Sequence, residues 1–336
     1  REIPRYRNLC PKPEAFCSQR STMGVGQCKP AKGFVKCEPT LMKKNVEEHR
    51  DEHVIKHGTS TVDPRAKRAI RKHFPGAHRA DIVLRTTRAV FKKYGFNEDN
   101  TLFASSTCPD EINCVIDDFS LIWGEHFSLG GLAGLPFTGK TGFTAFSHHV
   151  PEKDGRLLIF FAPHIGVASD GKTGKVHRLG IKKVTSACGS CIAAQNTALS
   201  SKRCKPCDDY DGPIGDYQQS VVTEIVSDFI QENQSRSKTD KLAKVEGDMN
   251  VKVTENLYER IKEEILKIIP DDFKKPIGLI GGILINTDYG NRQHDYILIK
   301  DLLIRKKNKK FVSLETELEN ALDEPRFSRL VYHDAA

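Results

Sequence analysis

Residues 157–162 have the sequence LLIFFA, a run of six consecutive apolar residues. A run of this length without polar alternation is typical of a β-strand that is buried on both faces. Such a strand belongs to a sheet that helices cover on both sides. His164 stands just past the run, where the buried strand would end.

Helices and further strands follow one another along the rest of the chain. Apolar residues at helical spacing predict helices within ADIVLRTTRAVFKKYG at 80–95, SVVTEIVSDFIQ at 220–231 and LYERIKEEILKIIP at 257–270. The segments GLIGGILIN at 278–286 and YILIKDLLI at 296–304 predict strands, with a turn-rich connection between them. This interleaving predicts an α/β fold with a mostly parallel central sheet flanked by helices.

A strand, a turn and a helix are predicted within NTLFASSTCPDEINCVIDDFSLI, at 100–122. The turn falls at residues 105–108, and Pro109 takes the first position of the helix, where its missing N–H costs nothing. Apolar residues then repeat at helical spacing. Cys108 is therefore expected between the carboxyl end of a strand and the amino end of a helix.

Cysteine and histidine side chains are expected at one edge of this sheet. Cys108 and His164 both follow strands, and functional groups gather at the carboxyl ends of parallel strands. The segment TSACGSC offers a further thiol at Cys188 or Cys191. Two thiolates and one imidazole suit zinc, and a site with three protein ligands keeps an open position, as catalytic zinc sites do. Asp110 is placed to lie beside such a metal and orient a water molecule.

The cysteines also allow a purely structural zinc site. Cys188 and Cys191 are followed, after twelve residues, by Cys204 and Cys207, a pair of CxxC knuckles of the zinc-ribbon type. A closed four-cysteine site would withdraw Cys188 from an active site. The candidate ligands at the strand ends then have simpler explanations, as a small buried thiol and a hydrogen-bonded core histidine.

The segment GLPFTGKT at 134–141 fits the phosphate-loop pattern G-x-x-x-x-G-K-[ST]. A phosphate loop needs a buried strand before it and a helix after it. The preceding EHFSLGGLA has no apolar run, and the following residues place Gly142, Phe and Thr where good helix formers are wanted and soon reach Pro151. Because neither element is expected, we interpret the segment as a glycine-rich turn that lines another kind of pocket.

Charge and hydropathy exclude two classes of partner. The formal net charge is +8, but the basic residues are scattered and much of the charge lies toward the chain ends, so we expect no nucleic-acid binding. The longest apolar runs are far too short for a membrane span. Residues 1–60 are predicted to form a loosely structured basic arm, residues 61–305 the α/β domain, and residues 306–336 a polar tail.

Several motifs occur together in an order that is similar to one known family. The segments FASSTCPDEIN, GLPFTGKTGFTAFSHH, LLIFFAPHIGV, GKVHRLG and ACGS together resemble the limiting-CO2-inducible protein B/C family of algae and some microbes. That family resembles the β-carbonic anhydrases in fold and is related to the theta-class enzymes. The similarity spans residues 61–305, and it explains GLPFTGKT as a glycine-rich turn of the family rather than a nucleotide site.

The resemblance implies a zinc ion held by Cys108, His164 and Cys188. Asp110 matches the aspartate of the β-type motif Cys-x-Asp-x-Arg. The arginine of that motif is replaced here by Ile112. An Asp–Arg pair must therefore recruit its arginine from elsewhere in the chain.

Arg178 in GKVHR is our candidate for this arginine, and Phe137 and Phe143 are candidates for the walls of a small apolar CO2 pocket. The reaction that the resemblance implies is the reversible hydration of CO2 to bicarbonate and a proton by a zinc-bound hydroxide. The resemblance also implies a homodimer and a chloroplast location; without it, we expect a soluble intracellular protein.

Two alternative functions stay open at this stage. One is a non-catalytic zinc-binding member of the same family that acts in a CO2-concentrating mechanism. The other is a zinc-ribbon interaction module appended to the α/β domain.

Overall fold

The structure is a computed structural model that describes residues 62–178, 180–200, 216–239, 248–288, 295–306 and 309–323. The predicted arm at residues 1–60 lies outside these ranges, and so do Cys204 and Cys207 of the possible zinc ribbon.

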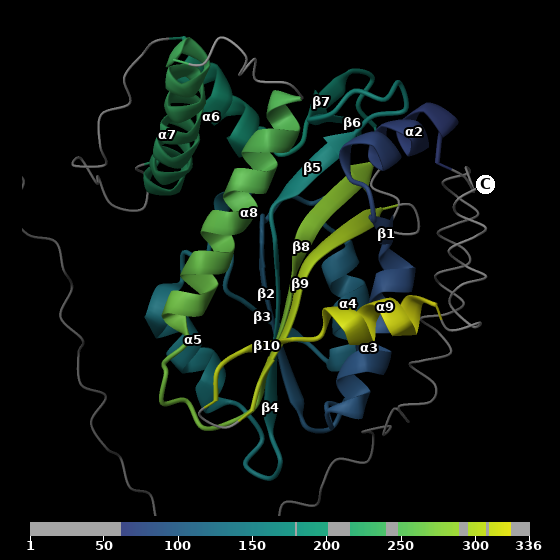
Figure 1. Ribbon diagram of the computed structural model, residues 1–336, viewed down its shortest axis with the longest axis vertical. Helices are drawn as coiled ribbons and strands as arrows, with labels where there is room; N and C mark the ends of the chain where they lie inside the picture. Colours follow the sequence, from purple (N-terminus) through teal and green to yellow (C-terminus); the bar gives the residue numbers. More distant parts are fainter. Residues whose placement is uncertain are drawn as a thin grey trace, which may run out of the picture. The chain divides into compact units, whose positions relative to one another are not determined.

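Among the described residues, eight strands form a central sheet in the order β1-β9-β8-β4-β2-β3, with β5 also beside β8 and β10 beside β9 (Figure 1). The strands are β1 (His78–Arg79), β2 (Thr101–Thr107), β3 (His126–Ser128), β4 (Arg156–Ala162), β5 (His164–Val167), β8 (Ile277–Thr287), β9 (Tyr296–Arg305) and β10 (Val312–Ser313). Parallel pairing joins β3, β2, β4, β8 and β5, whereas β9 is antiparallel to its neighbours. A separate antiparallel pair consists of β6 (Lys175–His177) and β7 (Val184–Ser186). The predicted α/β fold with a mostly parallel central sheet is confirmed.

Helices cover both faces of the sheet (Figure 1). They are α2 (Pro64–His73), α3 (Ala80–Lys93), α4 (Val115–Trp123), α5 (Gly139–His148), α6 (Gly189–Leu199), α7 (Tyr217–Thr239), α8 (Met249–Ile268) and α9 (Glu315–Leu322). One core contains the apolar residues of α3, α4 and α9, and the other contains those of α2, α5, α7 and α8. None of the described helices is both long and apolar enough to cross a membrane.

The predicted buried strand is β4, which lies between β2 and β8. Leu158 and Phe160 point into the core on the α3 and α4 side, while Ile159 and Phe161 point into the core on the α8 side. Phe160 stacks on Phe119 of α4 with 4.7 Å between the ring centroids. The run is uniformly apolar because successive side chains enter two different cores.

The helix after β2 begins later than predicted. It begins at Val115, and residues 109–114 are non-helical, with turns at 111–112 and 114. Asn113 closes this segment: its backbone N–H donates to the carbonyl of Asp110 over 3.1 Å, and its side-chain amide donates to the carbonyl of Cys108 over 2.9 Å. Pro109 therefore lies in the non-helical segment that directly follows Cys108.

A helix does follow the glycine-rich segment, contrary to our expectation. α5 begins at Gly139, and its residues Phe143 and Phe146 are almost fully buried. Burial of this apolar face outweighs the weak helix propensity of the sequence. On the upstream side, β3 is a short edge strand that ends at Ser128, well before Gly134.

Residues after 305 include ordered structure where a polar tail is predicted. Leu314, the N-cap residue of α9, and Ala321 within this helix are buried, and the Tyr94 hydroxyl donates to Glu317 over 2.6 Å. The compact domain therefore extends to α9, because this helix covers part of the sheet together with α3. Residues 324–336 lie outside the described ranges.

Candidate metal centre

Three side chains with soft ligand atoms lie at the carboxyl ends of the parallel strands. Cys108 follows β2, and His164 begins β5 just after β4 ends. Thr107 of β2 is paired with Ala162 of β4, so the two strands end at the same level. Cys188, the N-cap residue of α6, completes the group. The structure thus brings together the three ligands that the resemblance implies.

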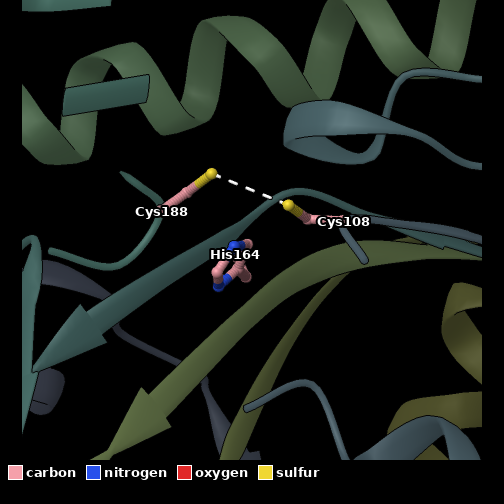
Figure 2. Close-up of side chains that lie close together, drawn as sticks. All are labelled: Cys108, His164 and Cys188. Atoms are coloured by element: carbon pink, nitrogen blue, oxygen red, sulfur yellow. Dashed lines mark hydrogen bonds between the residues drawn. The ribbon is translucent and has the colours of Figure 1, made fainter. Parts of the chain in front are cut away.

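The three side chains converge on one point (Figure 2). The sulfur atoms of Cys108 and Cys188 are 3.8 Å apart, and the ligand atoms of all three residues lie within 4.8 Å of one another. All three residues are buried, and no second group of this kind occurs in the part of the chain that the structure describes. Nε2 of His164 is buried without a hydrogen-bond partner, which is costly unless another group engages it. Two thiols and an imidazole so arranged fit a zinc ion.

The electrostatics of the set favour a cation. A hydrogen bond with Cys108, followed by one with Cys191, is the main cause that lowers the pKa of Cys188. The hydrogen bond with Cys188 and burial both raise the pKa of Cys108. Burial disfavours a charged His164, but the Cys188 sulfur and the Asp110 carboxylate raise the pKa of this imidazole. The amino end of α6 also favours a thiolate at Cys188. A metal ion must displace the remaining protons when it binds.

His164 is oriented by two polar residues that the sequence analysis missed. Nδ1 of His164 is 2.9 Å from Oδ1 of Asn286, and the Asn286 amide donates to Asp295 over 3.2 Å and to the carbonyl of Ile112 over 3.3 Å. Asp295 also accepts from the backbone N–H of Thr287 over 2.9 Å. A polar residue at the carboxyl end of an otherwise apolar strand segment is the signal that could have identified Asn286.

Asp110 and Arg178 form a bidentate ion pair beside the three ligands. Nη1 of Arg178 is 2.7 Å from Oδ1 of Asp110, and Nη2 is 2.9 Å from Oδ2. Oδ2 of Asp110 is also 3.8 Å from Nε2 of His164. Although burial opposes ionisation, Arg178 and His164 hold the pKa of Asp110 below its ordinary range. The Arg178 side chain also donates two hydrogen bonds to β7. Nε donates to the Thr185 hydroxyl over 2.9 Å, and Nη2 donates to the carbonyl of Ser186 over 3.1 Å.

The glycine-rich turn that precedes α5 lies against Cys108. Backbone hydrogen bonds from Asp110 and Ala133 lower the pKa of Cys108, opposing the larger effects of Cys188 and burial. Gly134 has φ +89°, and a Cβ atom there would lie 2.6 Å from the carbonyl oxygen of Ala162. The turn therefore fits between the ends of β2 and β4 only with glycine at this position.

The two candidate pocket residues occupy different surroundings. Phe143, in α5, is buried against Phe146 and Phe273. Phe273 lies between α8 and the start of β8, near the amino ends of the parallel strands, whereas Cys108 follows the carboxyl end of β2. Phe137 lies in the glycine-rich turn and contacts the Tyr217 ring at 6.2 Å between centroids. The structure thus places Phe143 in the core, away from the three ligands.

Comparisons with known proteins identify a family and a shared fold. A family model described as limiting CO2-inducible proteins B/C beta carbonic anhydrases matches residues 77–306. The crystal structure of PtLCIB4, a homolog of the limiting CO2-inducible protein LCIB, has 28% sequence identity and a TM-score of 0.62, and the alignment covers 73% of this chain and 98% of that one. The crystal structure of LCIB itself, at 21% identity and a TM-score of 0.54, shares the fold over 72% of this chain and 95% of its own. Curated protein sequences give no significant match.

Proposed function

Because this chain belongs to the family of limiting CO2-inducible proteins B/C and β-carbonic anhydrases, we propose that it is a zinc-dependent carbonic anhydrase that interconverts CO2 with bicarbonate and a proton. The observation that carries the proposal is the convergence of Cys108, His164 and Cys188 beside an Asp110 carboxylate that Arg178 holds.

The three ligands would hold one zinc ion through two thiolates and an imidazole. When bound, the ion supplies a Lewis-acidic centre that lowers the pKa of a water molecule toward neutrality. Asn286 holds the His164 ring through Nδ1, so Nε2 is the nitrogen left to face the metal. Such partners of a ligating histidine fix its tautomer and orientation.

Asp110 has the position and the charge for a water-orienting residue. Both of its carboxylate oxygens face the Arg178 guanidinium, which keeps the side chain ionised and fixed. A carboxylate fixed in this way can accept a hydrogen bond from a water molecule and direct the remaining lone pairs toward CO2. The same pairing opposes a closed site in which Asp110 itself takes the fourth ligand position, because the carboxylate would have to leave Arg178.

The ligand set lies in buried surroundings of low polarity. Cys108 is 6% exposed, Cys188 3% and His164 1%, so these side chains are shielded from bulk solvent. Electrostatic effects are stronger in such surroundings than in water. We assign Phe137, four residues after the Ala133 that contacts Cys108, to the apolar wall of the CO2 pocket.

Stopped-flow CO2 hydration, at a pH a little above 8, tests the proposal. We expect the zinc-loaded protein to hydrate CO2 well above the buffer rate, and Cys108→Ser to lose both the zinc and the rate. Cys114→Ser is the matched control, since Cys114 lies six residues further along, in the same β2–α4 connection, and its thiol donates to the carbonyl of Glu111. Background rates from a zinc-containing wild type would support the non-catalytic zinc-binding role. Two zinc ions per chain would indicate a second site that includes Cys204 and Cys207.

We also propose a homodimer in the chloroplast, on the strength of the family resemblance. Light scattering should give about twice the chain mass of 37.7 kDa, and a single-chain mass would refute the dimer. A fluorescent fusion of the full-length protein, imaged in its native cell, should coincide with chlorophyll; a signal elsewhere would exclude the chloroplast location.

A further inference from the structure

Two adjacent glutamines near the start of α7 contact the two segments that carry the cysteines of the proposed metal centre. Gln218 and Gln219 are the second and third residues of this helix, and both side chains are partly buried. Gln218 contacts the loop of residues 130–138, which lies against the end of β2, directly before Cys108. Gln219 contacts the first turn of α6, for which Cys188 is the N-cap residue. Neither glutamine has a part in the proposed reaction.

Gln218 holds the 130–138 loop through a direct hydrogen bond. Its Oε1 accepts from the backbone N–H of Leu132 over 2.9 Å. Gly131 lets the side chain come this close, since a Cβ atom there would collide with Oε1 of Gln218 and lie 2.6 Å from the ring of Phe137. A larger residue at position 131 would therefore push the glutamine or the phenylalanine aside.

The same loop is fixed to the end of β2. The Ser106 hydroxyl donates to the carbonyl of Gly134 over 2.9 Å. Gly130 packs directly on the backbone of the strand, because a Cβ atom added there would collide with the carbonyl oxygen of Thr107. Cys108 is the next residue along the chain, so a shift of the loop also shifts the backbone that presents this thiol.

Gln219 holds the first turn of α6 through both ends of its amide. The Ser190 hydroxyl donates to its Oε1 over 2.7 Å, and its Nε2 donates to the Ser190 carbonyl over 3.2 Å. Nε2 also lies 3.3 Å from the Thr223 hydroxyl, one turn further along α7. Ser190 is the second residue after Cys188, whose carbonyl accepts from the N–H of Ile192 over 3.1 Å as the helix begins. The amide therefore fixes the turn that carries the Cys188 thiol.

The orientation of both amides follows from their backbone partners. A backbone N–H only donates, and a backbone carbonyl only accepts. The N–H of Leu132 therefore faces Oε1 of Gln218, and the carbonyl of Ser190 faces Nε2 of Gln219. The two glutamines thus have different requirements: the contact of the first needs only an acceptor, and the contact of the second needs an acceptor and a donor.

The two glutamines are neighbours on one helix, whereas Cys108 and Cys188 are 80 positions apart in the chain. A tetrahedral zinc ion with Zn–S bonds of about 2.3 Å holds two sulfur ligands about 3.8 Å apart. The sulfurs of Cys108 and Cys188 lie at this distance, 3.8 Å. Ligands that are fixed at the binding distance lose little freedom when the metal binds, which favours tight binding.

We propose that Gln218 and Gln219 are positioning residues of the metal centre. By joining the 130–138 loop and the first turn of α6 to the amino end of α7, they hold the sulfurs of Cys108 and Cys188 at the distance that a tetrahedral metal ion requires. This role rests on the proposed zinc site. Loss of either amide then lowers the affinity for the metal and loosens its coordination, although all three ligands remain.

Methionine substitutions test this role, because methionine has nearly the length of glutamine but no amide. We expect Gln218→Met and Gln219→Met each to lower zinc affinity, measured by competition with a chelator, roughly 10-fold. The cobalt-loaded variants should keep the thiolate-to-cobalt charge-transfer band, while the d–d bands that report tetrahedral geometry should broaden and weaken. Gln231→Met is the matched control, since Gln231 is an exposed residue of the same helix. Its affinity and spectrum should equal those of the wild type.

Glutamate substitutions distinguish positioning from a general effect on stability. Gln218→Glu keeps the acceptor that the N–H of Leu132 needs, so we expect wild-type affinity and spectrum. Gln219→Glu keeps an acceptor for the Ser190 hydroxyl but sets a second acceptor against the Ser190 carbonyl, so we expect it to behave like Gln219→Met. The contrast between the two glutamate variants holds even where a methionine variant fails to fold.

Two results would overturn the inference. One is wild-type affinity and a wild-type cobalt spectrum in folded Gln218→Met and Gln219→Met, with only the free energy of unfolding lowered, since a purely structural role has that signature. The other is an equal defect in Gln218→Glu and Gln218→Met, because the hydrogen bond to Leu132 would then not be what matters.

These measurements separate the positioning role from the proposed function. If the wild type binds metal but hydrates no CO2, carbonic anhydrase activity is excluded, and altered cobalt spectra in the methionine variants still establish the positioning role. If the wild type hydrates CO2 and the glutamine variants all keep its affinity and spectrum, the enzyme stands and the positioning role is excluded. A wild type that binds no metal excludes both.

Discussion

Arg178 holds Asp110 through two parallel hydrogen bonds of 2.7 and 2.9 Å, although the two residues are 68 positions apart in the chain. Arg178 follows β6, while Asp110 lies in the turn after β2. The pair compensates for Ile112, which stands where the β-type motif has its arginine. Because Ile112 is buried with Val176 and Ala187, the arginine is supplied from the β6–β7 hairpin that packs beside it.

Removal of the Arg178 guanidinium should impair the reaction without emptying the zinc site. We expect Arg178→Ala to lower kcat/KM for CO2 hydration roughly 10- to 100-fold, a loss typical of residues that orient groups around a metal site. Arg178→Lys should not restore the rate, because an ammonium cannot form the bidentate pair with Asp110. Zinc content, measured alongside the rate, should stay at the wild-type value.

Arg88→Ala provides the matched control for this prediction. Arg88 pairs with Glu98 on the surface, and both side chains are about 40% exposed. Its loss should change neither the zinc content nor the rate. Wild-type turnover in Arg178→Ala would show that Asp110 needs no arginine.

Asn286 should be required for tight zinc binding. Asn286→Ala removes the acceptor of His164 Nδ1 and leaves the imidazole free to rotate. We expect zinc affinity, measured by competition with a chelator, to fall roughly 10- to 100-fold. Asn233→Ala, which removes an amide that donates within α7 to the carbonyl of Phe229, should leave the affinity unchanged. Unchanged affinity in folded Asn286→Ala would exclude this positioning role.

Asp295 should make the stability of the protein depend on pH. Burial raises the pKa of this carboxyl to about 7 in the folded state. A raised folded pKa favours the fold at low pH, so this contribution is complete below roughly pH 4 and is lost as the pH rises through about 7. The loss amounts to at most about 4 kcal/mol.

Urea unfolding of metal-free wild type and Asp295→Asn at pH 5 and pH 8 measures this effect. The amide does not ionise, so the variant should lose less stability between the two pH values than the wild type does. Asp99→Asn, a change at an exposed loop position, should keep the wild-type dependence. Equal pH dependence in wild type and Asp295→Asn would contradict the assignment.

Gly134 should be essential for the turn against Cys108. Gly134→Ala forces a side chain into a left-handed conformation and within 2.6 Å of the Ala162 carbonyl oxygen. We expect the free energy of unfolding to fall by at least about 2 kcal/mol. Zinc affinity should fall as well, because Ala133 would no longer donate to Cys108.

Gly139→Ala tests the effect of left-handed backbone strain without the collision that a Cβ atom at position 134 would make. Gly139 has φ +59°, also left-handed, but a Cβ atom there would meet nothing within 4 Å. This variant should lose only about 1 kcal/mol and keep its zinc affinity. Similar losses in the two variants would show that the contact with Ala162 is unimportant.

The fold and the positions of Cys108 and His164 were accessible from the sequence because both depend on local patterns. The uniform run at 157–162 predicts a strand buried on both faces, and the parallel strand β2 beside it ends at the same level. Cys108 and His164 follow those ends, so their approach to each other is a consequence of strand pairing. The third ligand, Cys188, came from the resemblance rather than from periodicity.

Local patterns failed where long-range packing decides the conformation. The sequence around Gly139 has weak helix propensity, yet α5 forms because Phe143 and Phe146 are buried in the core. In that core Phe143 packs against Phe146 and Phe273. α4 begins late because the Asn113 side chain bonds to the Cys108 carbonyl, a contact that helical spacing does not reveal.

The sequence by itself determined the class of fold, its central buried strand and the positions of Cys108 and His164 after strand ends, since these follow from apolar periodicity and strand pairing. Only the tertiary structure decided the groups that surround the ligands. Asn286, Asp295 and Arg178 reach the site from β8, the start of β9 and the β6–β7 hairpin. Their contacts join residues far apart in the chain, and hydrogen bonds of that kind are set by how the strands pair and pack rather than by any local pattern.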